Sequence, residues 1–158
     1  MTTQEMLRMN HDKIIKYIYF TAIFFLAISG FGQMPIFKRY YIADIPGLGW
    51  LAKFFVNHYL HYLFGIILLA LSAYIITYFF LILRKKFIIT SSGYIRASIL
   101  SGLIVSGIIM VIKNFPGYHY SPGFIIAMDL IHLGLVFMFL ITGLICILIK
   151  KTKYTSYA

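Results

Sequence analysis

Hydrophobic positions along the chain fall in four long runs that are separated by short polar segments. The runs are Ile14–Gly32, Phe54–Leu83, Tyr94–Ile112 and Gly123–Ile149. About 20 apolar residues cross a hydrocarbon core roughly 30 Å thick, and each run is near that length or longer. A backbone in lipid must satisfy its polar groups internally, so each run predicts a helix rather than a strand. The pattern therefore predicts an all-α integral membrane protein, folded as an up-down bundle of four helices.

The composition excludes a soluble protein and favours a single domain. The chain has 158 residues, of which 61% are hydrophobic and 11% charged, a balance far from that of a soluble domain. The four runs leave little chain for anything else, so we expect one transmembrane domain over residues 1–158. The first run is too long for the core of a signal peptide, and no small-x-small cleavage site follows it. We therefore expect it to be retained.

The basic residues predict how the helices are oriented. The chain carries 14 Lys and Arg against 4 Asp and Glu, a net charge of +10. Ten of the 14 lie at the two termini and in the connection after the second run, up to Arg96. The other four are Lys38, Arg39, Lys53 and Lys113. By the positive-inside rule, both termini and the second connection are cytoplasmic, and the other two connections face the periplasm or the exterior. We therefore expect a multi-pass protein of the inner cell membrane, whose basic charge sets its topology and binds no nucleic acid.

Three histidines lie inside or at the edge of the predicted spans, where ionisable residues are costly and are the first candidates for function. His61 lies about seven residues into the second run and His132 about nine into the fourth, both counted from the outer end. At about 1.5 Å per residue, both are roughly 10–14 Å deep from the same side. Gly65 follows His61 by about one turn and Gly134 lies close to His132, which would leave room for a macrocycle. The pattern predicts His61 and His132 as axial ligands of the iron of a b-type haem, an arrangement typical of electron transfer.

Other interpretations of the polar residues stay open. The two span histidines could instead form hydrogen bonds in a polar contact between helices. His58, one turn before the first of them, is a candidate alternative ligand or a contact for a haem propionate. Asp129 could orient His58 or pair with Lys53 or Lys113, and could equally be a solvated acid at the membrane edge. His119, in the short outer connection, is predicted at the surface.

Few other residues could hold a redox centre. Cys146 is the single cysteine, which excludes an internal disulfide and an iron–sulfur cluster bound by this chain alone. His11 lies at the cytoplasmic start of the first helix, too far from the outer pair to share its metal. A second haem at His11 would need another ligand near the cytoplasmic ends of the helices, where the sequence offers no histidine.

The histidines and their neighbours follow a recognisable order along the whole chain. His11 opens the first helix, Ser29-Gly30 lies near its far end, and a proline-rich outer loop follows. His-x-x-x-Gly then runs from His61 to Gly65 in the second helix, and His132 lies early in the fourth. In this order the chain resembles the membrane cytochrome b subunits of respiratory formate dehydrogenases, the gamma subunits, and the related subunits of nickel–iron hydrogenases and thiosulfate reductases.

The resemblance implies two haems stacked across the bilayer. It assigns the outer haem to His61 and His132, and the inner haem to His11 and a histidine 14 residues after His132. That position is Cys146 here, so three outcomes stay open. The chain binds one haem only, or a second haem through His11 with Cys146 or another group, or a second haem shared with another subunit. The family places its quinone site beside the inner haem, which makes His11 a candidate quinone contact.

The resemblance also implies a function, that of a membrane anchor and electron conduit without catalysis of its own. An iron–sulfur subunit and a catalytic subunit would dock over the periplasmic loops, and the chain would pass electrons between them and the quinone pool of the respiratory chain. A different class stays open: a non-redox scaffold or small transporter subunit whose histidines are structural or bind a metal. A metal path would need carboxylates or thiolates through the whole membrane, and the spans contain only Asp129 and Cys146.

Overall fold

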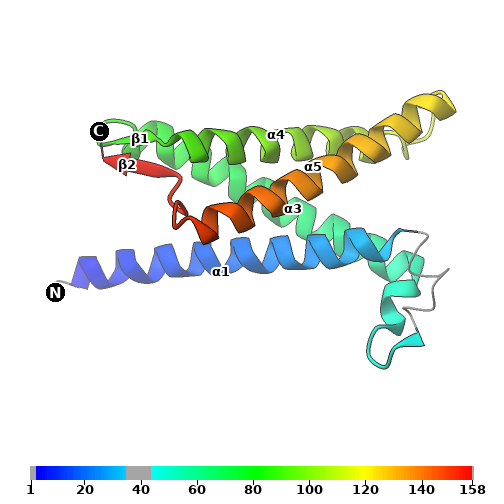
Figure 1. Ribbon diagram of the computed structural model, residues 1–158, viewed down its shortest axis with the longest axis horizontal. Helices are drawn as coiled ribbons and strands as arrows, with labels where there is room; N and C mark the ends of the chain where they lie inside the picture. The colour runs from blue at the N-terminus through cyan, green and yellow to red at the C-terminus, as the bar shows by residue number, and fades with distance from the viewer. Residues whose placement is uncertain (1–2, 35–43, 158) are drawn as a thin grey trace. The chain divides into compact units, whose positions relative to one another are not determined.

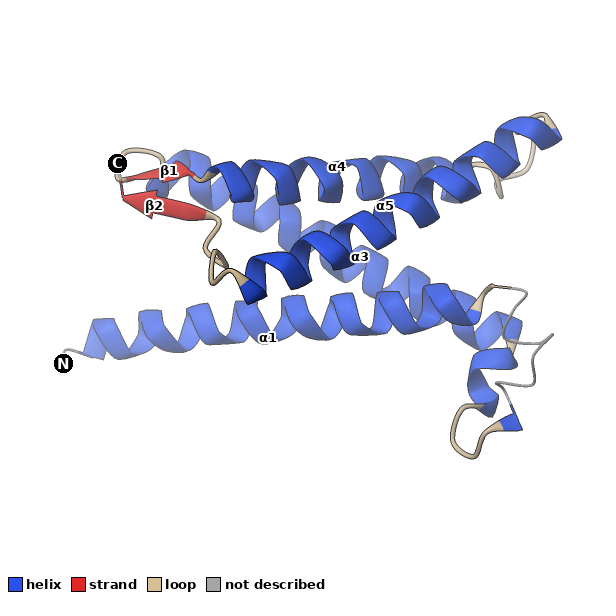
Figure 2. Cartoon of the chain, viewed as in Figure 1, coloured by secondary structure: helices blue, strands red, loops and turns tan. Residues whose placement is uncertain are grey.

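Helices make up most of the chain. The computed structural model describes the backbone of residues 3–34 and 44–157 and the side chains of residues 13–34 and 44–156. The long helices in this part of the chain are α1 (Thr3–Gly32), α3 (Phe54–Tyr78), α4 (Ser91–Ile112) and α5 (Pro122–Leu148) (Figure 1). Shorter elements are the 3-10 turn η2 (Gly49–Ala52), the π-helical turn η3 (Phe79–Leu83) and the strands β1 (Phe87–Ile89) and β2 (Thr155–Tyr157) (Figure 2). With 77% of the structure helical and little sheet, the predicted all-α class is confirmed.

The membrane spans agree with the hydrophobic runs of the sequence. The described helical stretches that are long and apolar enough to cross a membrane are Lys13–Gly32, Phe54–Leu83, Ser91–Ile112 and Pro122–Leu148. Each end lies within one turn of the predicted end. Large apolar side chains stay exposed along these stretches, among them Phe24, Ile66, Leu130 and Leu144. Such a surface suits lipid and not water, so the chain is a multi-pass membrane protein.

Residues 1–78 form one compact unit and residues 79–158 a second. The first unit is a hairpin of α1 and α3. Phe25 of α1 stacks on Phe64 of α3 with ring centroids 4.4 Å apart. Ser29, one turn later on α1, meets His61, earlier on α3, so the two helices are antiparallel. That the two units form one domain stays a prediction.

The second unit is a hairpin of α4 and α5 (Figure 1). Leu135 of α5 covers Gly102 of α4, where an added Cβ would lie 3.2 Å from Leu135 Cδ1. Ser106, one turn later on α4, meets His132, earlier on α5. Increasing residue numbers in one helix again meet decreasing numbers in the other, so this pair is also antiparallel.

Hydroxyl caps begin both helices of the second unit. The Thr90 side chain accepts a hydrogen bond from the Gly93 amide at 3.0 Å. The Ser121 side chain accepts one from the Phe124 amide at 3.3 Å. Pro122 occupies the first turn of α5, where its missing N–H costs nothing. These caps fix where α4 and α5 begin, and therefore which side chains face each other across the hairpin.

A short sheet and a buried arginine hold the C-terminal tail against the start of α4. Strands β1 and β2 pair antiparallel (Figure 2). Arg96, only 7% exposed, donates from Nη1 to the Thr152 carbonyl at 3.1 Å and from Nη2 to the Lys153 carbonyl at 3.2 Å. Its guanidinium lies 3.8 Å from the centroid of the Tyr154 ring. From the sequence, Arg96 is predicted to be one of the basic residues of the cytoplasmic connection. In the structure, its side chain anchors the C-terminal tail.

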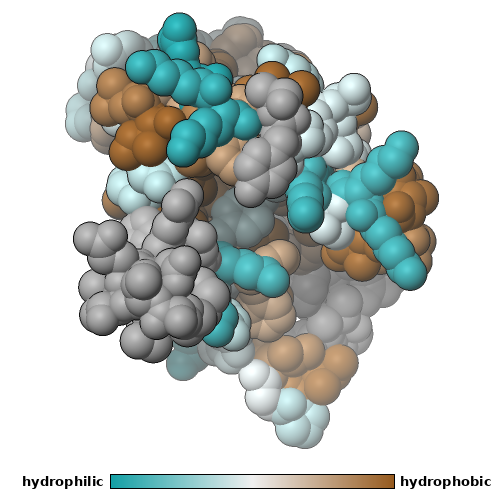
Figure 3. All heavy atoms as spheres, turned by 90° about the vertical axis from the view of Figure 1, so that its left-hand side faces the viewer, coloured by the Kyte–Doolittle hydropathy of each residue, from teal (hydrophilic) through white to brown (hydrophobic). Residues whose placement is uncertain are grey.

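Exposed basic side chains flank β1 and β2 along the chain. They are Arg84, Lys85, Lys86, Lys150, Lys151 and Lys153. Figure 3 faces the end of the second unit that carries β1 and β2, and hydrophilic side chains gather there. Asp129, the acid of this unit, lies nearer the opposite end of α5. The basic side chains and Asp129 thus lie toward opposite ends of the second unit, and the orientation of the termini in the membrane stays a prediction.

Arg96→Leu is expected to release the C-terminal tail without unfolding the helices. The carbonyls of Thr152 and Lys153 lose their donors, and a hydrogen bond to a charged group is worth about 1.5–3 kcal/mol. Since about 1.4 kcal/mol is a factor of ten, amide exchange in residues 152–157 should become at least about tenfold faster in hydrogen–deuterium exchange mass spectrometry. Arg84→Leu, which changes an exposed arginine, is the matched control. Equal exchange in the two variants would contradict the anchoring role.

Candidate functional site

His61 lies in α3, and its ring is held by residues of α1. Its Nδ1 lies 2.9 Å from the Ser29 hydroxyl. Gly30 lies against the ring, because an added Cβ there would be 3.4 Å from His61 Cε1. The ring is half-buried, and Ser29 is only 1% exposed. An apolar pair of spans thus contains a fixed polar contact at His61.

The second unit repeats this arrangement. His132 lies in α5, and its Nδ1 is 2.8 Å from the Ser106 hydroxyl of α4. An added Cβ at Gly107 would be 3.6 Å from His132 Cε1. Ser106 is 4% exposed. In both hairpins, therefore, the first helix supplies Ser-Gly and the second supplies the histidine.

The hydroxyl proton of each serine is directed to its own helix. Ser29 donates to the Phe25 carbonyl at 2.5 Å, and Ser106 donates to the Gly102 carbonyl at 2.8 Å. A hydroxyl has a single proton, so a serine that keeps its proton on its own helix can only accept from the histidine, which then carries a proton at Nδ1. A neutral imidazole protonated at Nδ1 has its lone pair on Nε2. With this direction of the hydrogen bond, each ring has the tautomer that binds a transition metal through Nε2.

These hydrogen bonds form a polar contact between helices, which was the other interpretation of the two histidines that the sequence left open. They do not compete with metal binding, because the serine contact uses Nδ1 and a metal would use Nε2. The structure brings His61 together with Ser29 and His132 together with Ser106. The meeting of His61 and His132 at one metal stays a prediction.

The glycines near the two histidines leave open space in their own hairpins. An added Cβ at Gly65 or at Gly134 would meet no heavy atom of its hairpin within 4 Å. Gly65 lies one turn after His61, and Gly134 two residues after His132. A large planar group bound to either histidine would therefore meet no side chain at these positions.

His58 belongs to a separate contact nearer the start of α3. Its Nδ1 lies 3.3 Å from Oε1 of Gln33. Its ring packs against Phe54 and Tyr62, with centroids 5.3 Å and 4.2 Å away. His58 thus lies one turn before His61 on α3, and its role as a ligand or as a propionate contact stays a prediction.

Asp129 forms an ion pair with Lys113, one of the partners expected from the sequence. Lys113 Nζ lies 2.9 Å from Asp129 Oδ1, and the carboxylate side chain is 49% exposed. A pair with this much solvent contact adds little stability. The ion pair does neutralise the charge of Asp129, which lies about one turn before His132 on α5.

Three other candidate residues were named from the sequence, Cys146, His119 and His11. Cys146 is a buried free thiol on α5, and His119 is exposed as predicted. The backbone of His11 is part of α1, and its side chain is not among those that the structure describes. Among the side chains that the structure describes, no three His, Cys, Asp or Glu residues come together to hold a metal ion. A centre with two protein ligands, as expected for this haem, needs no such cluster.

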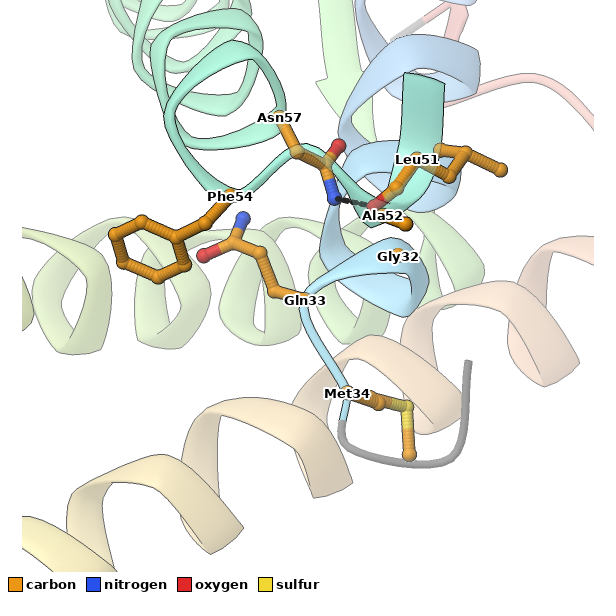
Figure 4. Close-up of a pocket in the computed structure, with 7 residues that line it drawn as sticks. All are labelled: Gly32, Gln33, Met34, Leu51, Ala52, Phe54 and Asn57. Carbon is orange, nitrogen blue, oxygen red and sulfur yellow. Dashed lines mark hydrogen bonds between the residues drawn. The ribbon is translucent and has the colours of Figure 1, made fainter. Parts of the chain in front are cut away.

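A small cavity lies in the first unit where α1 ends and α3 begins, about one turn along α3 from His61 (Figure 4). It has a volume of about 110 Å³. Its lining residues are Gly32, Gln33, Met34, Leu51, Ala52, Phe54 and Asn57. Asn57 is 1% exposed, and its amide donates to the Leu51 carbonyl at 3.3 Å. Its Oδ1 has no hydrogen-bond partner among the described residues, and the cavity is large enough for water to supply one.

Sequence reasoning did not assign Ser29 and Ser106 to the site. Ser106 has no role in the prediction from the sequence, and Ser29-Gly30 entered only through the family resemblance. The dipeptide Ser-Gly also occurs at Ser92-Gly93 and Ser101-Gly102, so it could not identify the two that meet histidines. Position along the chain is the signal that could identify the right pair. Each of these two Ser-Gly dipeptides lies in the span before a histidine, near the end of the hairpin where that histidine lies.

Comparisons with protein-family models, with curated proteins and with solved structures gave no match to this chain. The cytochrome family named from the sequence therefore stays an expectation.

Proposed function

We propose that the chain is a b-type haem subunit that passes electrons between a partner enzyme and the quinone pool of the inner cell membrane. His61 and His132 are its axial ligands. The observation that carries the proposal is the hydrogen bond from each Nδ1 to a buried serine, at 2.9 Å and 2.8 Å. In the proposal Nδ1 donates in both contacts, and each imidazole then has the Nε2 lone pair that ligation requires.

The residues present fit a haem held between two histidines. Both ligands are neutral imidazoles, so binding needs no charged ligand in lipid. Gly65 and Gly134 leave space beside them, and the apolar spans around them exclude water. A haem with both axial positions filled supplies one-electron oxidation and reduction, and it leaves no coordination site for a substrate. The chain itself orients the rings and excludes water from them.

The depth of the site favours exchange with a partner on the outer side. His61 lies seven residues after α3 begins, about 10 Å along the helix. In the second unit, the connection between α4 and α5 is exposed, and we propose it as a docking surface. The proposed partners are an iron–sulfur subunit and a catalytic subunit facing the periplasm, and the substrate belongs to that catalytic subunit.

The proposal assigns one haem to the described ligand pair and a quinone as the exchangeable carrier. A second haem would need His11 and a further ligand, and Cys146 stands where the resemblance expects a histidine. In the proposal, His11 is instead a candidate contact for the quinone at the cytoplasmic side. This part rests on the resemblance alone.

Electron transfer is tested with the purified full chain in lipid vesicles. A short-chain naphthoquinol or benzoquinol is mixed with the oxidised protein without oxygen, and the haem absorption bands are followed. We expect the b-type bands of the reduced haem to appear, and to disappear when excess quinone is added. A chain that carries haem but exchanges no electrons with either quinone pair would contradict the quinone assignment. A folded chain without haem would favour the non-redox scaffold or transporter class.

A further inference from the structure

Each candidate ligand is held by a serine on the preceding helix of its own hairpin. Ser29 and Ser106 are buried, and each bonds a histidine Nδ1. Each also donates its proton to the carbonyl four residues earlier, so its oxygen is an acceptor toward the ring. The contact occurs in two hairpins whose sequences differ around the serine. Close packing alone would require neither the imidazole contact nor its repetition.

The glycine after each serine leaves room for the same edge of the ring. An added Cβ would be at ordinary contact distance from Cε1, 3.4 Å at Gly30 and 3.6 Å at Gly107. With glycine, no side chain lies between the backbone and the ring at this point. The hydrogen bond at Nδ1 therefore orients an imidazole that a larger residue after the serine would crowd.

We propose that Ser29 and Ser106 are positioning residues that fix the tautomer of the two ligands and lower the reduction potential of the haem. This inference rests on the proposed function. An acceptor at Nδ1–H increases the electron density that Nε2 gives to the iron. Ferric iron, with its larger charge, gains more from that density than ferrous iron. A serine supplies the acceptor without placing a carboxylate charge inside the membrane.

The tautomer is tested on the full chain in lipid nanodiscs without haem, with histidine labelled by nitrogen-15. Nitrogen NMR should show Nδ1 protonated in both His61 and His132. Ser29→Ala should change the signals of His61 alone, and Ser106→Ala those of His132 alone. The matched control is Ser101→Ala, because this serine is exposed on α4 and is also followed by glycine. Rings protonated at Nε2 in the unsubstituted chain would overturn the inference, whether or not the chain binds haem.

The potential is tested on the haem-loaded full chain by redox titration. Removing an outer-shell partner of a metal ligand costs about tenfold or more in metal binding. A tenfold loss in the preference for ferric over ferrous iron is about 59 mV for a one-electron couple. We therefore expect Ser29→Ala and Ser106→Ala each to raise the midpoint potential by about this amount, and Ser→Thr, which keeps the hydroxyl, to restore it.

Two outcomes separate this inference from the proposed function. If the alanine variants keep the potential of Ser101→Ala while losing stability, the serines only pack the helices and the inference is wrong. If the tautomer changes as expected but no variant binds haem, the tautomer role is supported, and the proposed function and its effect on potential are overturned.

Discussion

Replacing either His61 or His132 by alanine is expected to remove the haem from the purified chain. Each change takes away one of the two proposed axial ligands, and even the loss of an outer-shell partner costs about 10–100-fold in metal binding. The haem content, measured from the pyridine haemochrome spectrum per mole of protein, should fall by more than about tenfold. Helix content should stay the same, because alanine keeps the backbone hydrogen bonds of both helices.

Two other histidines are the matched controls. His58→Ala should keep the haem, because the His58 ring is bonded to Gln33 and lies one turn outward from the proposed ligand. His119→Ala should also keep it, because this residue is exposed in the outer connection. Loss of haem in His58→Ala, with retention in His61→Ala, would instead make His58 the ligand on α3.

Valine at Gly30 or Gly107 is expected to displace the neighbouring histidine and to lower haem content by more than about tenfold, a loss typical of a disturbed metal site. Alanine should be tolerated, because its Cβ would be 3.4 Å or 3.6 Å from the ring carbon, an ordinary contact. The additional methyl groups of valine reach further and would overlap the ring. Overpacking of this kind costs about 1–3 kcal/mol, and here the histidine absorbs it by leaving its position.

The size series at these glycines is measured by haem content and by thermal unfolding in the same detergent. Gly143→Val on α5 is the control, because an added Cβ there meets nothing within 4 Å. The prediction is contradicted if valine at Gly30 and Gly107 leaves the haem content at the level of this control. The histidine rings would then not limit the size of the side chain at these two positions.

The spans could be predicted because lipid imposes one requirement on a whole run of residues. A helix that satisfies its own backbone and exposes apolar side chains is readable from composition alone. The ends were readable too: Pro122 follows the cap Ser121, and α5 begins there. The first helix extends back to Thr3, beyond the predicted Ile14, because its polar beginning lacks the hydrophobic signal that defined the run.

Contacts between distant residues could not be predicted in the same way. Arg96 carries the signal of a loop charge, and its role depends on carbonyls more than 50 residues later. The strands β1 and β2 have three residues each, which is too short for an alternating pattern to identify them. The histidines were found as rare polar residues in apolar spans. Their serines were not, because a serine in a membrane helix ordinarily bonds its own backbone, and these two do so as well.

The most direct test of the haem assignment is the pyridine haemochrome spectrum of the purified full chain, together with protein quantification. The proposed ligand pair predicts a b-type spectrum with about one haem per chain, since two histidines fill the axial positions of one iron. A folded chain that carries no haem would contradict it.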